Sequence, residues 1–288
     1  MAFTMSCGDV RADLDATSAF DIGRLAVECV ALNPGPAIPP NGDARIDHAL
    51  AGFLFTCGPD HIRHPEPFDG VPDGGRYPLH GSMAGTPASG IRADRSGDTF
   101  AAEVEVPLAD GGRARVSRRY DRHSGAEAIG LSDCLRNTGA TPFAPMVMYH
   151  LNLGGRLFDA DTAFRGAMMP EGQLPWRFGE GERGLALFDA RPAAIAGWAA
   201  LSLGPFAILG GRWLHLRFDT ATLPFLQMWR LQRGDADVVS IEPASHRIAS
   251  RSELAAQGEL VALAPGETVR YGLAFAFGAE TLQDGPWR

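Results

Sequence analysis

The sequence contains no lysine, and all 26 of its positively charged residues are arginine. Enzymes that form a Schiff base with a substrate or with pyridoxal phosphate need a lysine amine, and the P-loop holds phosphate with a lysine ammonium. The absence of lysine therefore excludes these mechanisms for this chain.

Cysteine pairs and long apolar runs are also missing. The four cysteines, Cys7, Cys29, Cys57 and Cys134, form no C-x-x-C pair and no spacing typical of a zinc or redox motif, so we expect buried, reduced thiols. No run approaches the roughly 20 apolar residues of a membrane-spanning helix, and the first residues lack a basic flank followed by an apolar stretch. We expect a cytoplasmic protein with no membrane partner.

The charge balance is acidic, with a formal net charge of -8. Phosphate backbones are held by clustered positive charge, so we expect no nucleic-acid partner. A chain of 288 residues with 45% hydrophobic residues is within the range of one large all-β domain, and we expect a single domain over residues 1–288. Arg115, Arg118 and Arg119 are expected on a solvated strand face; the alternative is an arginine-rich rim that admits an acidic or sulfonated sugar.

Glycine and proline, 35 and 21 residues, divide the chain into short segments. Convincing helical periodicity is scarce: residues 17–32 fit a helix or a strand, and residues 252–260 at most a short turn of helix. Long loops are expected at 33–47 and 58–78. Antiparallel strands are predicted from alternating or compact apolar runs at 101–108, 126–131, 144–153, 199–209, 212–218, 224–231, 237–242 and 268–277. The pattern predicts an all-β fold.

Three positions carry side chains suited to acid and base chemistry. His80 follows the second long loop and precedes Gly81; it is either a loop anchor or a functional group. His150 and Asn152 interrupt an apolar strand and share one of its faces, with Tyr149 and Leu151 facing the core. They form either a buried pair or the lining of a polar cavity.

Glu242 ends the apolar run VVSIE in the second strand of a predicted hairpin at 224–242, which turns at RGDAD. Pro243 lacks a backbone donor, so we expect the strand to end there and to leave the carboxylate at a rim. A carboxylate in such a run either serves as a base or is paired with arginine or loop amides. On the first strand of the hairpin, Gln227 and Trp229 share a face.

A metal site is an alternative reading of the second loop. His61 and His64 would suit metal binding on a helix, but the surrounding proline and glycine disfavour a helix there. No metal site is therefore predicted.

Short motifs in a fixed order resemble the galactose mutarotase-like superfamily, which contains the aldose 1-epimerases. They are L-H-G at 79–81, Y-H-x-N at 149–152 and I-E-P at 241–243. A closer likeness is to a bacterial aldose 1-epimerase-like branch, through T-C-G-x-D at 56–60, P-L-H-G at 78–81 with P-A at 87–88, and Y-H-x-N-x-G at 149–154. The resemblance covers roughly residues 50–275 and leaves residues 1–45 as a divergent N-terminal portion. It implies a large antiparallel β-sandwich, the galactose mutarotase-like supersandwich.

The resemblance also implies a function: the protein binds a sugar and interconverts its α and β anomers without a cofactor. Glu242 would take the proton of the anomeric hydroxyl, His150 would protonate the ring oxygen, and His80 would hydrogen-bond that oxygen. The remaining residues that we expect to contact the sugar are Asp60, His61, Arg63, Asn152, Gln227 and Trp229, the last by stacking on its apolar face.

Two other functions fit the same residues. One is a sugar-binding module on the same fold without catalysis, because a fold does not fix a function. The other is a metal-dependent β-barrel isomerase or oxygenase that uses His61, His64 and His80.

Overall fold

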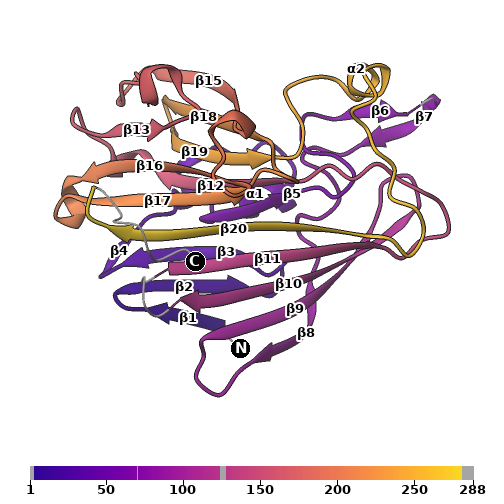
Figure 1. The fold of residues 1–288 in the computed structure, drawn as a ribbon, viewed down its shortest axis with the longest axis horizontal. Helices are drawn as coiled ribbons and strands as arrows, with labels where there is room; N and C mark the ends of the chain where they lie inside the picture. The colour runs from indigo at the N-terminus through magenta and orange to yellow at the C-terminus, as the bar shows by residue number, and fades with distance from the viewer. Residues whose placement is uncertain (1–2, 70, 124–127, 281–288) are drawn as a thin grey trace.

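Antiparallel strands dominate the computed structural model, which describes residues 3–69, 71–123 and 128–280 (Figure 1). The strands are β1 Phe3–Cys7, β2 Val10–Asp15, β3 Asp21–Val27, β4 Val30–Ala31, β5 Leu54–Cys57, β6 Glu66–Phe68, β7 Val71–Tyr77, β8 Ala88–Ala93, β9 Thr99–Pro107, β10 Arg113–His123, β11 Ala128–Asn137, β12 Met148–Gly154, β13 Ala163–Gly166, β14 Gln173–Leu174, β15 Glu182–Asp189, β16 Trp198–Phe206, β17 Arg212–Asp219, β18 Phe225–Arg233, β19 Ala236–Ala244 and β20 Thr268–Gly278. The helices are α1 Ala44–Leu50 and α2 Arg251–Ala256, with 3-10 turns η1 Gly35–Ala37, η2 Gly155–Leu157, η3 Pro170–Gly172, η4 Arg191–Ala193 and η5 Ala207–Leu209. The all-β prediction is confirmed.

The described strands form one large sheet and several smaller ones. The large sheet has the order β14-β13-β16-β17-β20-β11-β10-β9-β8, and a five-stranded sheet has the order β15-β18-β19-β12-β5. Strands β1 to β4 form a sheet of their own, and β6 pairs with β7. One hydrophobic core joins the large sheet to the inner faces of the five-stranded and N-terminal sheets, so the molecule is a β-sandwich.

Alternation along the strands decides which side chains enter this core. In β10, Ala114, Val116, Arg118 and Tyr120 are buried, and the residues between them are more exposed. Arg118 is therefore inside the sandwich with 1% of its surface exposed, and its expected place on a solvated face was wrong. Its charge is compensated by the carboxylates of Asp133 and of Asp21, which lies on β3 of the N-terminal sheet.

The expected loops contain secondary structure of their own. Residues 44–47 belong to α1, which begins after Asp43, whose carboxylate accepts a hydrogen bond from the Arg45 amide at 3.1 Å. The stretch 58–78 contains the hairpin β6–β7, and the ambiguous stretch 17–32 contains β3 and β4. The short turn of helix expected within 252–260 is confirmed as α2.

The end of β19 also differs from the prediction. The strand continues through Pro243 to Ala244, because β18 lies opposite and pairs Leu226 with Pro243. Glu242 is thus on the central strand of the five-stranded sheet, with 0% of its surface exposed, and not at a rim. A missing backbone donor one residue from the strand end does not stop the pairing.

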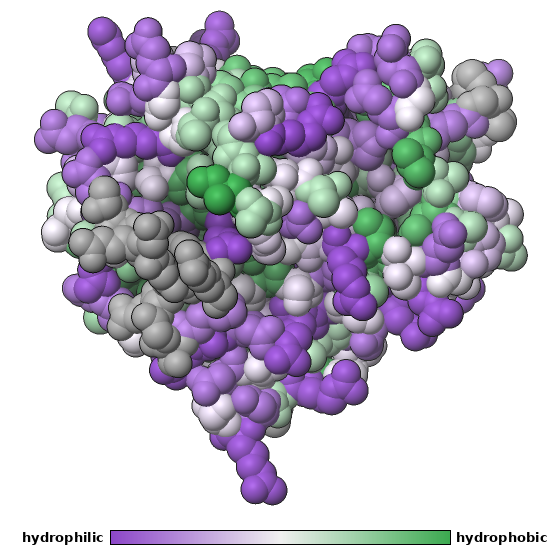
Figure 2. Space-filling model, viewed as in Figure 1, coloured by the Kyte–Doolittle hydropathy of each residue, from purple (hydrophilic) through white to green (hydrophobic). Residues whose placement is uncertain are grey.

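Two raised parts of the molecule stand at the upper left and the upper right of Figure 1. One carries α2 and the hairpin β6–β7, and the other carries β15. Figure 2 shows the surface hollowed between them, at the upper edge of the view. Within the described part of the chain, no helix is both long enough and apolar enough to cross a membrane.

Candidate acid and base site

Polar side chains from separate strands form one row on the outer face of the five-stranded sheet. The register of β18 and β19 pairs Gln227 with Glu242, and the register of β12 and β5 pairs His150 with Phe55. The pairing of β12 with β19 places His150 opposite Glu242. Because paired strands are about 4.8 Å apart, these side chains touch although they are far apart in sequence.

A chain of hydrogen bonds runs along this row. Arg63 donates through Nη1 to the Gln227 Oε1 at 2.7 Å, and the Gln227 Nε2 donates to the Glu242 Oε2. The Glu242 Oε1 accepts from the Ser240 hydroxyl and lies 3.0 Å from the His150 Nε2. Because the guanidinium occupies the Gln227 oxygen, the amide nitrogen must face Glu242, and the carboxylate is held in one orientation.

The other nitrogen of His150 contacts its neighbour on the same strand face. The His150 Nδ1 hydrogen-bonds the Asn152 Oδ1. The Asn152 Nδ2 donates to the carbonyl oxygens of Leu50 and Gly52, at 3.3 and 3.2 Å. The sequence prediction that His150 and Asn152 share a face, with Tyr149 and Leu151 in the core, is confirmed.

His80 reaches this row from a loop that is tightly bound to the T-C-G-x-D segment. The backbone amide of Gly58 donates to the His80 carbonyl at 2.9 Å, and Asp60 accepts from the amide and hydroxyl of Ser82 at 2.9 and 2.6 Å. A Cβ atom on Gly81 would lie 2.2 Å from the His61 carbonyl, so only glycine fits there. His80 itself has a φ of 57°, a left-handed conformation that places its ring beside His150.

The ring of His80 packs edge-on against two rings of the row. The ring centroids of His80 and His150 are 5.9 Å apart, and those of His80 and Phe55 are 5.3 Å apart. The His80 Nδ1 lies 3.2 Å from the Ile62 carbonyl, which can only accept, and 3.5 Å from the Cys57 Sγ, which is a weak hydrogen-bonding partner. We therefore assign the proton to Nδ1 and a lone pair to Nε2. Burial, and secondarily the neighbouring His150, lowers the pKa of His80 to about 3. The ring therefore offers an acceptor to a ligand.

We expect His80 to remain neutral between about pH 5 and 8, where an ordinary histidine titrates. As the pH falls from about 6.5 towards about 3, the unfolded chain takes up a proton and the folded chain does not, so this ring lowers stability across that window. Histidine ring ¹⁵N NMR measures the charge state, with the urea-unfolded chain as the control. A protonated His80 ring near pH 5.5 would contradict the expectation.

The accessible side of the site is formed by Arg63, His80 and Trp229, which are partly exposed, whereas His150 and Glu242 are buried. The Trp229 ring has its centroid 6.0 Å from that of His150, and the strand register places Trp229 on the same face as Gln227, as predicted. A ligand therefore meets an aromatic ring, a guanidinium and a neutral imidazole before it meets the buried pair.

Two residues expected to contact the sugar have other partners. Asp60 receives hydrogen bonds from Ser82 and from the Ala109 amide, and so holds the loop that carries His80. His61 is fully buried, donates through Nε2 to the His64 carbonyl at 2.6 Å, and stacks on Tyr77 with ring centroids 5.6 Å apart. The structure brings neither side chain into the row of His150 and Glu242.

Three residues of the site were missed in the sequence. Ser240 could have been found, because it precedes Glu242 by two residues and period two places both on one face. Phe55 gave no signal, and Cys57 was named only as part of the T-C-G-x-D motif, because only the pairing of β5 with β12 brings them here, with the Cys57 Sγ 3.5 Å from the His80 Nδ1. Burial, and then the charge of Glu242, raises the pKa of the Cys57 thiol well above its usual range, so this cysteine is not a thiolate nucleophile.

The metal alternative has no geometric support. Among residues 3–69, 71–123 and 128–280, no three His, Cys, Asp or Glu side chains gather as a metal-binding group. The Nε2 of His61 faces a backbone carbonyl, and His64 is exposed.

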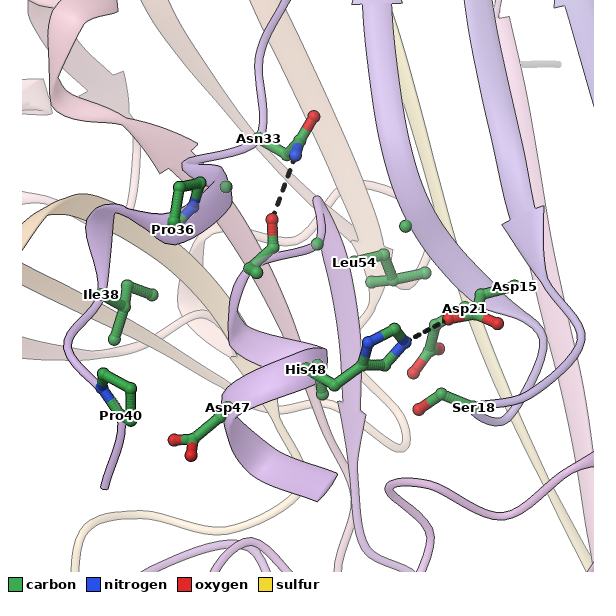
Figure 3. Close-up of a pocket in the computed structure, with 15 residues that line it drawn as sticks. Asp15, Ser18, Asp21, Asn33, Pro36, Ile38, Pro40, Asp47, His48 and Leu54 are labelled. Atoms are coloured by element: carbon green, nitrogen blue, oxygen red, sulfur yellow. Dashed lines mark hydrogen bonds and ion pairs between the residues drawn. The ribbon is translucent and has the colours of Figure 1, made fainter. Parts of the chain in front are cut away.

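A separate hollow of about 510 Å³ lies beside α1, away from the row. Figure 3 shows His48 and Asp15 in contact in its lining, with Nε2 and Oδ2 2.5 Å apart. At its rim, the Asn33 Nδ2 donates to the Ala51 carbonyl at 3.0 Å, just after the end of α1. None of the residues that line it belongs to the row of His150 and Glu242.

Comparisons with known proteins agree on the fold. The protein family described as "Domain of unknown function (DUF4432)" matches residues 8–185 and 206–277 of this chain. No functionally curated protein matches the sequence.

Several solved structures are similar to nearly the whole chain. A candidate aldose 1-epimerase from Klebsiella pneumoniae has a TM-score of 0.77 and 17% identity, over 94% of this chain and 77% of that one. A candidate aldose 1-epimerase from Escherichia coli K12 has a TM-score of 0.69 and 15% identity, over 97% and 99%. A galactose mutarotase-like protein from Lactobacillus casei has a TM-score of 0.65 and 11% identity, over 96% and 100%. At these identities the likeness shows the fold alone, and it confirms the galactose mutarotase-like sandwich.

Proposed function

This chain belongs to the family described as Domain of unknown function (DUF4432), and from its site we propose that it binds a sugar and interconverts its α and β anomers. The observation that carries the proposal is the contact between the His150 Nε2 and the Glu242 Oε1, at 3.0 Å, beside the partly exposed His80 and Trp229. An imidazole and a carboxylate at this distance hold one exchangeable proton between them.

Anomer exchange needs one group that accepts a proton and one that donates a proton. In the proposed reaction, the Glu242 carboxylate takes the proton of the anomeric hydroxyl while a His150 ring that carries hydrogens on both nitrogens gives its Nε2 proton to the ring oxygen, and the C1–O5 bond breaks. His150 is then left with its hydrogen on Nδ1. The open-chain aldehyde rotates about its C1–C2 bond. The ring then closes on either face, and both protons return to their original groups, so no cofactor is consumed.

The remaining site residues suit the recognition of a sugar ring. The resemblance assigns His80 a hydrogen bond to the ring oxygen, but a neutral ring with its proton on Nδ1 has only a lone pair to offer at Nε2. We therefore assign His80 as the acceptor of a sugar hydroxyl hydrogen. Trp229 would stack on the apolar face of the sugar, and Arg63 and Gln227 would orient Glu242.

The test is anomer exchange by the wild-type protein over a panel of neutral, deoxy, acidic and sulfonated aldoses. NMR exchange spectroscopy or polarimetry on freshly dissolved α anomers measures the rate against buffer alone. Acceleration with at least one sugar supports the proposal and identifies the substrate class. Binding in ligand-observed NMR without acceleration would instead support a sugar-binding module, and the absence of both would overturn the proposal.

A further inference from the structure

We propose that Asn152 is a positioning residue that keeps a hydrogen on the His150 Nδ1 and so leaves Nε2 as the nitrogen that exchanges a proton; this inference rests on the function proposed above. The Asn152 amide is fully buried, and both of its ends have protein partners. It therefore acts on the sugar only through His150, in contrast to the direct contact expected from the sequence.

The orientation of the Asn152 amide is determined by its surroundings. Its Nδ2 faces the carbonyl oxygens of Leu50 and Gly52, which can only accept hydrogen bonds. A flipped amide would place its own oxygen against these two oxygens and leave them without a donor. The Asn152 Oδ1 consequently faces His150.

This orientation selects one tautomer of the histidine. Because the Asn152 Oδ1 accepts, the His150 Nδ1 must carry a hydrogen. The nitrogen whose proton is exchanged is then Nε2, which lies 3.0 Å from the Glu242 Oε1. The opposite tautomer would set the Nδ1 lone pair against the lone pairs of the amide oxygen.

The same amide binds the C-terminal end of α1. A helix leaves its last carbonyl oxygens without partners, and the Asn152 Nδ2 satisfies the Leu50 carbonyl at the end of α1 and that of Gly52 just beyond it. Loss of Asn152 therefore affects both the helix end and the histidine, and a test must separate the two effects.

Asn33 provides the matched control. Its Nδ2 donates to the Ala51 carbonyl, also at the end of α1 (Figure 3). Among the hydrogen bonds of the described residues, none joins Asn33 to His150. The experiment compares Asn152→Leu with Asn33→Leu in two measurements: the kinetics of anomer exchange, and ring ¹⁵N NMR of His150, which reports the protonated nitrogen.

In the wild-type protein we expect a hydrogen on the His150 Nδ1. In Asn152→Leu we expect this preference to be lost and kcat to fall about 10- to 100-fold, as is typical when the partner of a functional histidine is removed, with KM little changed. Asn33→Leu should leave both the NMR signature and kcat unchanged.

Three results would overturn the inference. They are a wild-type His150 with its only proton on Nε2, a raised KM at constant kcat in Asn152→Leu, and an equal loss of kcat in Asn33→Leu. The NMR measurement does not need turnover. If the wild-type protein exchanges no anomer, the proposed function fails. The ring ¹⁵N NMR of His150 in the wild-type protein and in Asn152→Leu still decides whether Asn152 keeps the hydrogen on Nδ1.

Discussion

Replacement of Glu242 by glutamine is expected to slow anomer exchange by about 100-fold or more, the usual loss when a general base is removed. An amide has nearly the shape of the carboxylate, and its oxygen can still accept from the Gln227 amide while its nitrogen faces His150. It cannot, however, take the proton of the anomeric hydroxyl. The rate is measured by NMR exchange spectroscopy on a sugar that the wild-type protein accelerates.

His150→Asn is expected to cause a loss of similar size, because it removes the proton donor that lies against Glu242. Glu103→Gln is the matched control, since Glu103 lies on the large sheet and bonds Ser117, outside the site. Thermal unfolding of each variant checks that the fold is retained. Wild-type rates in both Glu242→Gln and His150→Asn would refute the assignment of acid and base.

The largest effect on stability is expected for Arg118→Met. The Arg118 Nε and Nη2 donate to Asp133 at 2.9 and 2.7 Å, Nη1 donates to Asp21, and Nη2 also donates to the Thr56 hydroxyl at 2.8 Å. Tyr149 adds a hydrogen bond from its hydroxyl to Asp133 at 2.7 Å. Without the guanidinium, two buried carboxylates lose their only cation among the described ion pairs, and the free energy of unfolding should fall by about 3–5 kcal/mol.

Urea denaturation followed by tryptophan fluorescence measures this change. Arg119→Met is the control: Arg119 is the next residue of β10, its side chain is 55% exposed, and it pairs with Asp121 on the surface. An exposed pair of this kind contributes at most about 1 kcal/mol. Equal and small effects of the two variants would show that the core tolerates the loss of the Arg118 network.

Sequence reasoning succeeded where local periodicity decides the outcome. Period two placed His150 with Asn152 on one strand face and Gln227 with Trp229 on another, and the hairpin of β18 and β19 has its turn at the predicted segment. Short motifs predicted the fold. One of them contains Gly81, which a close backbone approach requires, and this glycine marks the loop that carries His80.

Sequence reasoning failed where the partner of a side chain lies in a distant part of the chain. The usual exposure of arginine predicts a surface position for Arg118, although period two places it beside Val116 and Tyr120 in the core. Asp60 is part of the T-C-G-x-D motif, but it anchors a loop and does not join the row. In both cases the missing information was the position of the hydrogen-bond partner.

The sequence by itself therefore determined eight of the strands, the faces of their side chains and the kinds of polar group available for chemistry, because strand alternation depends only on neighbouring residues. Only the tertiary structure decided that Phe55, His150, Glu242 and Gln227 form one row, because the pairing of four strands spans most of the chain. The pairing also buried Glu242 and turned the Asn152 amide towards His150, since both depend on groups that no local pattern specifies.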